Sequence, residues 1–272
     1  MQISHTASGG DRCASGLRPG RRAFLHALTG FACIASWPGL AIELIPRSRC
    51  AATPVRMPAR GALRRTAARL RAKMPVHVLA IGSSSTQGVG ASSPAAAYPA
   101  RLELALEQRF PGANVEVINA GKAGETADRT LERLNAELDR IKPDLVLWQV
   151  GTNDALTASV SEPKFEAVVE RGILSIERHK SDVLLVDPQF IKKVQDPARY
   201  ERFVETLERV AEKEHICLFS RYHLMKTLDA APGGGVEPLL APDGLHMNDA
   251  GYACVAERLA GQIQDLVSRL DP

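Results

Sequence analysis

The sequence has few aromatic residues, few cysteines and no long apolar run, and each shortage excludes a class of protein. Aromatic residues make up 5% of the 272 residues, which leaves few rings for stacking against sugars. The five cysteines match neither a disulfide scaffold nor a metal-binding spacing. The longest apolar stretch falls short of the ~20 residues that a membrane span needs. With 45% hydrophobic and 24% charged residues, the composition is that of a globular protein.

Basic residues are outnumbered by acidic ones over most of the chain. The net charge of +3 hides a division, because residues 1–74 carry thirteen basic and two acidic side chains. Residues 75–272 carry 21 basic and 29 acidic side chains, a net charge of −8. This acidic part lacks the basic stripe that phosphate contacts need. We therefore expect no nucleic-acid partner.

The basic N-terminal segment has the parts of an export signal. Arg21 and Arg22 precede an uncharged stretch, Ala27–Ile42, with the small residue Ala41 near its end. The pattern resembles twin-arginine translocation signals, which carry folded proteins across the bacterial inner membrane. It predicts a signal peptide over residues 1–41, cleavage near Ala41, the Tat translocation machinery as the precursor's partner, and a periplasmic or secreted protein without a stable membrane span. A retained membrane anchor and an accidental arginine pair are the alternatives.

Residues 42–74 are rich in arginine, alanine and proline, and we interpret them as a basic linker. A basic helix over residues 61–73 that touches an anionic membrane is the alternative. Three cysteines follow the predicted signal. Cys217 and Cys254 lie in apolar runs, and together with Cys50 they are expected to be small buried apolar residues.

From residue 76 onward, short apolar runs alternate with amphipathic stretches. The runs are too short and too continuous for anything but buried strands, so they predict a parallel sheet covered by helices on both faces. The fold class is α/β: a three-layer α/β/α sandwich with a five-stranded parallel sheet, in one domain over residues 75–272. The strands are expected at residues 76–81, 115–118, 145–150, 183–186 and 216–219, and the helices at 98–110, 126–141, 165–176, 200–211 and from about 248.

In such sheets ligands bind beyond the carboxyl ends of the strands, so functional residues are expected in the loops there. After the first strand, residues 82–88 place Ser84 on a glycine-flanked turn, where a hydroxyl projects above the sheet. The loop has no Gly-Lys-Ser/Thr of a Walker loop. It also lacks the second glycine of the Gly-x-Ser-x-Gly turn, because Thr86 stands there.

Three more loops carry polar groups. Gly124 precedes a capped helix, where a backbone N–H approaches a ligand closely or simply forms a tight turn. Asn153 follows the third strand and either donates to a developing oxyanion or bonds its own backbone. Asp243 and His246, three residues apart before the last helix, place a carboxylate against an imidazole.

Ser84, Gly124, Asn153 and the Asp243/His246 pair, in this order over residues 76–268, resemble the four blocks of the SGNH (GDSL-type) hydrolases. The resemblance implies the flavodoxin-like fold of that family. It also implies that Ser84 is the nucleophile, that His246 is its general base and that Asp243 orients the imidazole. The N–H groups of Ser84 and Gly124 and the side chain of Asn153 would then form the oxyanion hole.

One residue departs from the family pattern. Ser83 stands where the family has an aspartate, so the first block reads Gly-Ser-Ser-Ser. Either neighbour, Ser83 or Ser85, is therefore an alternative nucleophile. The alignment of Gly82, Thr86 and Gly88 favours Ser84.

The resemblance implies a serine esterase that hydrolyses acetyl or short-acyl carboxylic esters through an acyl-serine intermediate, with acylated polysaccharide among its substrates. It implies no metal and no organic cofactor. Two alternatives stay open: an O-acyltransferase that uses the same site, and a non-catalytic exported carbohydrate-binding module.

Overall fold

The computed structural model describes Cys50, residues 61–233 and residues 235–270. The predicted export signal lies outside these residues.

The centre of the described domain is a five-stranded sheet in which every pairing is parallel. The strand order is β2-β1-β3-β4-β5. Side chains alternate between the two faces, so that Leu147 and Trp148, neighbours on one strand, are both fully buried in different cores. The strands are β1 (Val76–Gly82), β2 (Val115–Gly121), β3 (Leu145–Gln149), β4 (Asp182–Val186) and β5 (Cys217–Phe219).

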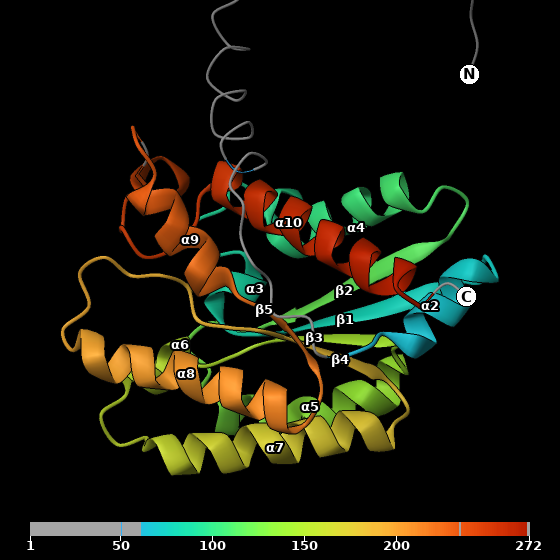
Figure 1. Ribbon diagram of the computed structural model, residues 1–272, viewed down its shortest axis with the longest axis horizontal. Coiled ribbons are helices and arrows are strands. Elements are labelled where there is room, and N and C mark those ends of the chain that lie inside the picture. The colour runs from blue at the N-terminus through green and yellow to red at the C-terminus, as the bar shows by residue number, and fades with distance from the viewer. Residues whose placement is uncertain (1–49, 51–60, 234, 271–272) are drawn as a thin grey trace, which may run out of the picture. The chain divides into compact units, whose positions relative to one another are not determined.

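Helices cover both faces of the sheet, as Figure 1 shows. One face carries α2 (Arg64–Arg71), α4 (Tyr98–Arg109), α9 (Arg221–Ala230) and α10 (Asp249–Ser268). The other face carries α5 (Ala127–Ile141), α7 (Glu162–Arg178) and α8 (Pro197–Lys213). Short helices α3 (Ser84–Gln87) and α6 (Thr152–Leu156) follow β1 and β3, and 3₁₀ turns occupy Pro94–Ala96 and Glu237–Leu239. The predicted three-layer α/β/α sandwich is confirmed.

Two local features differ from the sequence analysis. From the sequence no helix is expected at α9; its first residue, Arg221, is buried, which breaks the spacing of apolar residues at three and four positions that marks an amphipathic helix. Thr126 stands at the N-cap of α5, but its side chain makes no capping bond. The Asp154 carboxylate, from α6, accepts a hydrogen bond from the Ala127 N–H there instead, at 3.0 Å.

Residues 61–74 belong to the folded domain, so the predicted linker over residues 42–74 is wrong for this part. In α2, Ala67 is fully buried in the core that α4 and α10 form on their face of the sheet. Two carboxylates at the amino ends of β3 and β4 hold the helix. Asp144 pairs with the Arg65 guanidinium at 2.7 Å, and Asp182 accepts hydrogen bonds from the Thr66 N–H and hydroxyl at 2.8 and 2.7 Å. Arg65 and Arg69, which suggested a solvated segment, thus neutralise the buried Asp144 carboxylate.

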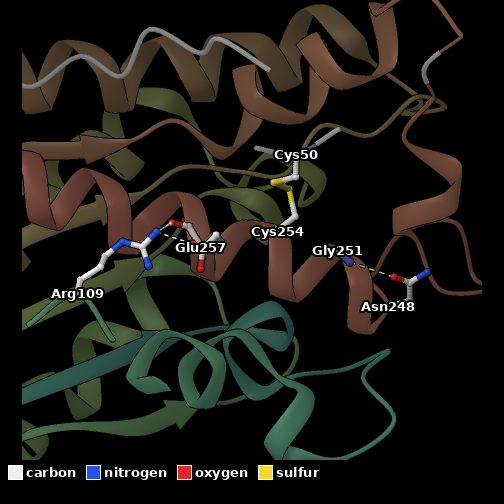
Figure 2. Close-up of a disulfide and its surroundings, with 6 residues drawn as sticks. All are labelled: Cys50, Arg109, Asn248, Gly251, Cys254 and Glu257. Carbon is white, nitrogen blue, oxygen red and sulfur yellow. Dashed lines mark hydrogen bonds and ion pairs between the residues drawn. A yellow bond between two sulfur atoms is a disulfide. The ribbon is translucent and has the colours of Figure 1, made fainter. Parts of the chain in front are cut away.

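The prediction for the cysteines also needs correction. Cys50 and Cys254 are buried, as expected, but they form a disulfide that joins residues 204 positions apart (Figure 2). Cys254 lies on α10, between the Asn248 cap and the Arg109–Glu257 ion pair. Cys217, in β5, is a free buried thiol, and burial raises its pKa to about 12. The apolar runs around Cys217 and Cys254 predicted burial and not bonding.

Among the described residues, no helix combines the length and the apolar character that crossing a bilayer requires.

We expect the Cys50–Cys254 disulfide to stabilise the domain, because it closes a very long loop in the unfolded chain. Cys50→Ser should lower the free energy of unfolding by roughly 2–5 kcal/mol. The measurement is denaturant unfolding with and without reductant. The matched control is reduction of the Cys50→Ser variant, which should change nothing further. Equal stability of wild type and variant under oxidising conditions would contradict the expectation.

Candidate active site

The predicted site residues meet at the carboxyl edge of the sheet. Strands β1, β2 and β3 run parallel and end at Gly82, Gly121 and Gln149, so the loops that follow them leave from the same edge. Helices α3 and α6 lie at this edge, at the opposite end of the strands from α2 (Figure 1).

Three side chains form a continuous chain of hydrogen bonds. The Ser84 hydroxyl lies 2.9 Å from His246 Nε2, and His246 Nδ1 lies 2.7 Å from Asp243 Oδ2. Ser84 is the first residue of α3 and is half-buried. A hydroxyl, an imidazole and a carboxylate in this order allow the imidazole to take a proton from the hydroxyl while the carboxylate holds the ring.

The Asp243 carboxylate is held as an anion. Its hydrogen bond with His246 lowers the pKa of Asp243 to about 2, and the Leu245 and His246 N–H groups, which both donate to Oδ1 at 2.9 Å, act in the same direction. The ionised carboxylate therefore persists at any ordinary pH. It favours the imidazole tautomer that carries its proton on Nδ1 and leaves Nε2 free to accept from Ser84.

The two serines beside Ser84 are engaged elsewhere. Ser83 is buried, and both its N–H and its hydroxyl donate to Gln149 Oε1 at 3.0 Å. Ser85 is also buried, and its hydroxyl donates to Gln189 Oε1 at 3.0 Å. Of the three adjacent hydroxyls, Ser84 is the one in contact with an imidazole.

Gly124 lies on an exposed loop that is tied to the Ser84 segment. The neighbouring Lys122 N–H donates to the Gly82 carbonyl at 2.9 Å, and the Ala123 N–H donates to the Gln87 side chain at 2.7 Å. Gly124 has φ of +79°, a conformation that side chains disfavour, and an added Cβ would meet open space. Among the described residues, none accepts a hydrogen bond from the N–H of Gly124 or of Ser84.

Asn153 is the second residue of α6, and its side chain is oriented by the Gly124 loop. Asn153 Nδ2 donates to the Glu125 carbonyl at 2.8 Å. An amide nitrogen carries two hydrogens, so one remains for a further acceptor. The next residue, Asp154, binds the Ala127 N–H, which fixes α6 to the start of α5. The structure thus links the Ser84 and Gly124 segments, the Gly124 and Asn153 segments, and the Ser84 and His246 segments.

Two glutamines were missed by the sequence analysis. Gln149 ends β3 and accepts from both Ser83 and Thr86 through its Oε1. Gln189 follows β4 and contacts the segments on either side of the site. Both are 1% exposed. A polar residue within or directly after a continuously apolar strand must find hydrogen-bond partners, and this signal was available in the sequence.

Two recesses flank the site. One, of about 510 Å³, adjoins Asp243 and mixes apolar side chains with charged ones; its lining includes Leu156, Ile191, Val194, Leu240 and Leu245. The other, of about 430 Å³, adjoins Gly124 and is strongly charged, with Lys122, Arg129 and Glu132 in its lining.

The part of the chain that the structure describes contains no cluster of three or more histidine, cysteine or acidic side chains arranged to hold a metal ion.

Comparisons with known proteins agree with this geometry. The chain is 27% identical to thioesterase 1/protease 1/lysophospholipase L1 of Escherichia coli (strain K12) over 199 residues, which are 70% of this chain and 85% of that protein. It is 28% identical to an arylesterase of Vibrio mimicus over 180 residues, which are 64% of this chain and 80% of that protein.

A solved structure of a two-domain esterase active on acetylated mannans, crystallised with mannopentaose, superposes with a TM-score of 0.66 at 26% identity. The match covers 79% of this chain and 57% of that esterase, so the chain spans little more than half of its length.

The fold and these relatives define the class of the protein, that of the carboxylic ester hydrolases with the SGNH arrangement of blocks. Residues 49–269 match the model of the Non-GDSL lipase-like family, and the chain belongs to that family. The family description agrees with the departure at Ser83, where the Gly-Asp-Ser-Leu motif is lost.

Proposed function

We propose that this chain hydrolyses acetyl or short-acyl carboxylic esters through an acyl-serine intermediate on Ser84. The observation that carries the proposal is the chain of hydrogen bonds from Ser84 through His246 to Asp243. Neither Ser83 nor Ser85 has such a partner among the described residues, which supports Ser84 over the two alternative nucleophiles.

In the proposed first step, Ser84 Oγ bonds to the carbonyl carbon of the ester while His246 Nε2 takes the hydroxyl proton. The carbonyl oxygen becomes an anion, and the N–H groups of Ser84 and Gly124 and the free N–H of Asn153 donate to it. When the bond to the alcohol breaks, the imidazolium returns its proton to the departing oxygen. Water then attacks the acyl-serine by the same route and releases the acid.

Substrate size and polarity follow from the recesses beside the site and from the relatives. The recess beside Asp243 is lined partly by Leu156, Ile191 and Leu245, which suits a short acyl group or another small apolar moiety. The charged recess beside Gly124 suits a polar alcohol such as a sugar. One relative is an esterase active on acetylated mannans, which supports acylated glycans as a substrate class.

We also propose that the chain is exported to the periplasm or beyond, after recognition by twin-arginine translocation machinery. Arg21 and Arg22 and the uncharged stretch that follows them motivate this proposal. The Cys50–Cys254 disulfide supports it, because disulfides persist in oxidising compartments and are rare in the cytosol.

We expect Ser84→Ala to lower kcat on a soluble acyl ester by roughly 10⁴–10⁶-fold, because only binding and oxyanion stabilisation would remain. The assay is initial rate on acyl esters of graded chain length and on acetylated oligosaccharides, with Ser83→Ala and Ser85→Ala in parallel. These two variants keep the reacting hydroxyl and should lose far less. Retained activity in Ser84→Ala together with its loss in a neighbour variant would assign the nucleophile to that neighbour. Product formed only when an alcohol acceptor is added would indicate a transferase.

The pH dependence should report the imidazole. The pKa of Asp243 lies near 2, so this carboxyl stays ionised across the assay range. We therefore expect a rising limb of kcat/KM that reports loss of a proton from the general base beside Ser84 and not from Asp243. Asp243→Asn removes the charge that stabilises the imidazolium, and we expect a shifted limb and a rate loss below the ~10⁴-fold of the serine-protease case. His246→Ala should lose more, and a near-normal rate with an unchanged pH profile in that variant would disprove the proposed base.

Replacing both Arg21 and Arg22 with lysine should leave the precursor in the cytoplasm, because twin-arginine recognition needs the guanidinium pair. The measurement is fractionation of bacterial cells with N-terminal sequencing of the mature protein. A single lysine replacement at Arg18, outside the pair, is the matched control. Native protein that is cytosolic and uncut near Ala41 would overturn the export proposal.

A further inference from the structure

One buried glutamine joins the two segments that carry Ser84 and His246. The Ser85 hydroxyl donates to Gln189 Oε1 at 3.0 Å, and Gln189 Nε2 donates to the Leu245 carbonyl at 2.7 Å. Ser85 directly follows Ser84, and Leu245 directly precedes His246. We call these two hydrogen bonds the Gln189 bridge. A single planar amide thus connects the two segments, one residue away from each of the proposed reacting side chains.

We infer that Gln189 is a positioning residue that holds Ser84 Oγ within hydrogen-bond distance of His246 Nε2. The inference rests on the proposed function, in which these two atoms exchange a proton. The contact joins residues 162 positions apart, so no local turn sets it. The Asp243–His246 contact differs, because it closes within three residues and depends on its own loop.

The segment that carries Gln189 is itself held by hydrogen bonds to two helices. Gln189 is 1% exposed, and its carbonyl accepts a hydrogen bond from the Tyr200 hydroxyl of α8 at 2.7 Å. Two residues earlier, the fully buried Asp187 carboxylate binds the Ser220 hydroxyl at 2.7 Å and the Tyr222 N–H at 2.8 Å. The segment after β4 is therefore fixed to α8 and to the start of α9. If the Ser84 turn or the His246 loop moved relative to the segment after β4, one of the two hydrogen bonds of the Gln189 bridge would break.

Loss of the Gln189 bridge should lower the rate of the chemical step more than it weakens substrate binding. Gln189 reaches Ser84 and His246 only through Ser85 and Leu245, and its side chain is buried away from solvent. A displacement of ~1 Å between reacting groups lowers rates by up to about a hundred-fold. A glutamine that merely fills the core would change stability and leave kcat alone.

The test compares Gln189→Met, which keeps a chain of similar length but makes neither bond, with Gln262→Met. Gln262 is the matched control: it is buried, and its Nε2 donates to the Leu218 carbonyl at 2.9 Å between α10 and β5. We expect Gln189→Met to lower kcat by about ten- to a hundred-fold with KM changed less than about twofold. The midpoint of the pH profile should stay, because the Asp243–His246 pair remains. Gln262→Met should lower the melting temperature with kcat retained.

Ser85→Ala removes one end of the Gln189 bridge and provides a milder variant if Gln189→Met fails to fold. We expect a smaller fall in kcat. Added to Gln189→Met, it should lower kcat no further, because the bond it removes is already absent. Additive losses in the double variant, or a fall in kcat equal to that of Gln262→Met, would overturn the inference.

Amide hydrogen exchange separates this inference from the proposed function, because it needs no turnover. Bridge loss should speed exchange at Leu245 and His246, whose N–H groups bind Asp243, and at Thr86 and Gln87, whose N–H groups bind the Ser83 carbonyl. If Ser84→Ala stays active while exchange rises in both segments, the proposed function fails and the bridge stands. Unchanged exchange in Gln189→Met would overturn the bridge, whatever the result for Ser84→Ala.

Discussion

The hydrogen bond between Ser84 Oγ and His246 Nε2 is the constraint on which the rest of the site depends. It joins the first strand-to-helix turn to the loop before the last helix, at 2.9 Å across 162 residues of sequence. A contact between such distant segments requires both to be held on one rigid frame, since each would otherwise drift by more than the tolerance of a hydrogen bond. The parallel sheet provides this frame, because Ser84 directly follows β1 and the His246 loop leads into α10, which packs against a face of the same sheet.

The helix that follows the His246 loop is fastened to the segment that follows Ser84. The Tyr252 hydroxyl of α10 donates to the Val89 carbonyl at 2.6 Å, and Asp249 accepts a hydrogen bond from the Ser92 N–H at 2.7 Å. Gly90 lies between them at φ of +92°, where a Cβ would stand 2.4 Å from the Met247 carbonyl oxygen, so only glycine allows this approach. These contacts add to those of Gln149 and Gln189, which bind the residues next to Ser84 and His246 directly.

The sheet was predictable because it depends on local pattern, whereas the roles expected of the four blocks rest on their resemblance to the SGNH hydrolases. Continuous apolar runs mark strands buried on both faces, and polar residues at their ends mark an edge where ligands bind. The disulfide, the docking of α2 and the two glutamine networks were not predictable in this way, because each joins segments far apart in sequence. Cys50 lies among arginines and prolines and gives no sign that its partner is on α10. Likewise Arg65 reads as a surface charge until Asp144, buried at the start of β3, is known to face it.

The loss of the family's aspartate at position 83 is consistent with the residue that faces it. Gln149 Oε1 accepts three hydrogen bonds, from the Ser83 N–H, the Ser83 hydroxyl and the Thr86 hydroxyl. A carboxylate in place of the Ser83 hydroxyl would face Gln149 Oε1, and neither group could donate a hydrogen bond to the other. The carboxylate would also be a buried charge with no cationic side chain among these contacts. Rotating the Gln149 amide would offer the new carboxylate a donor but would leave the Ser83 N–H, buried beside it, facing an amide nitrogen. Ser83 and Gln149 therefore form a neutral hydrogen-bonded pair. This pair holds the turn of Ser84 without adding a second negative charge near the imidazole that Asp243 already orients.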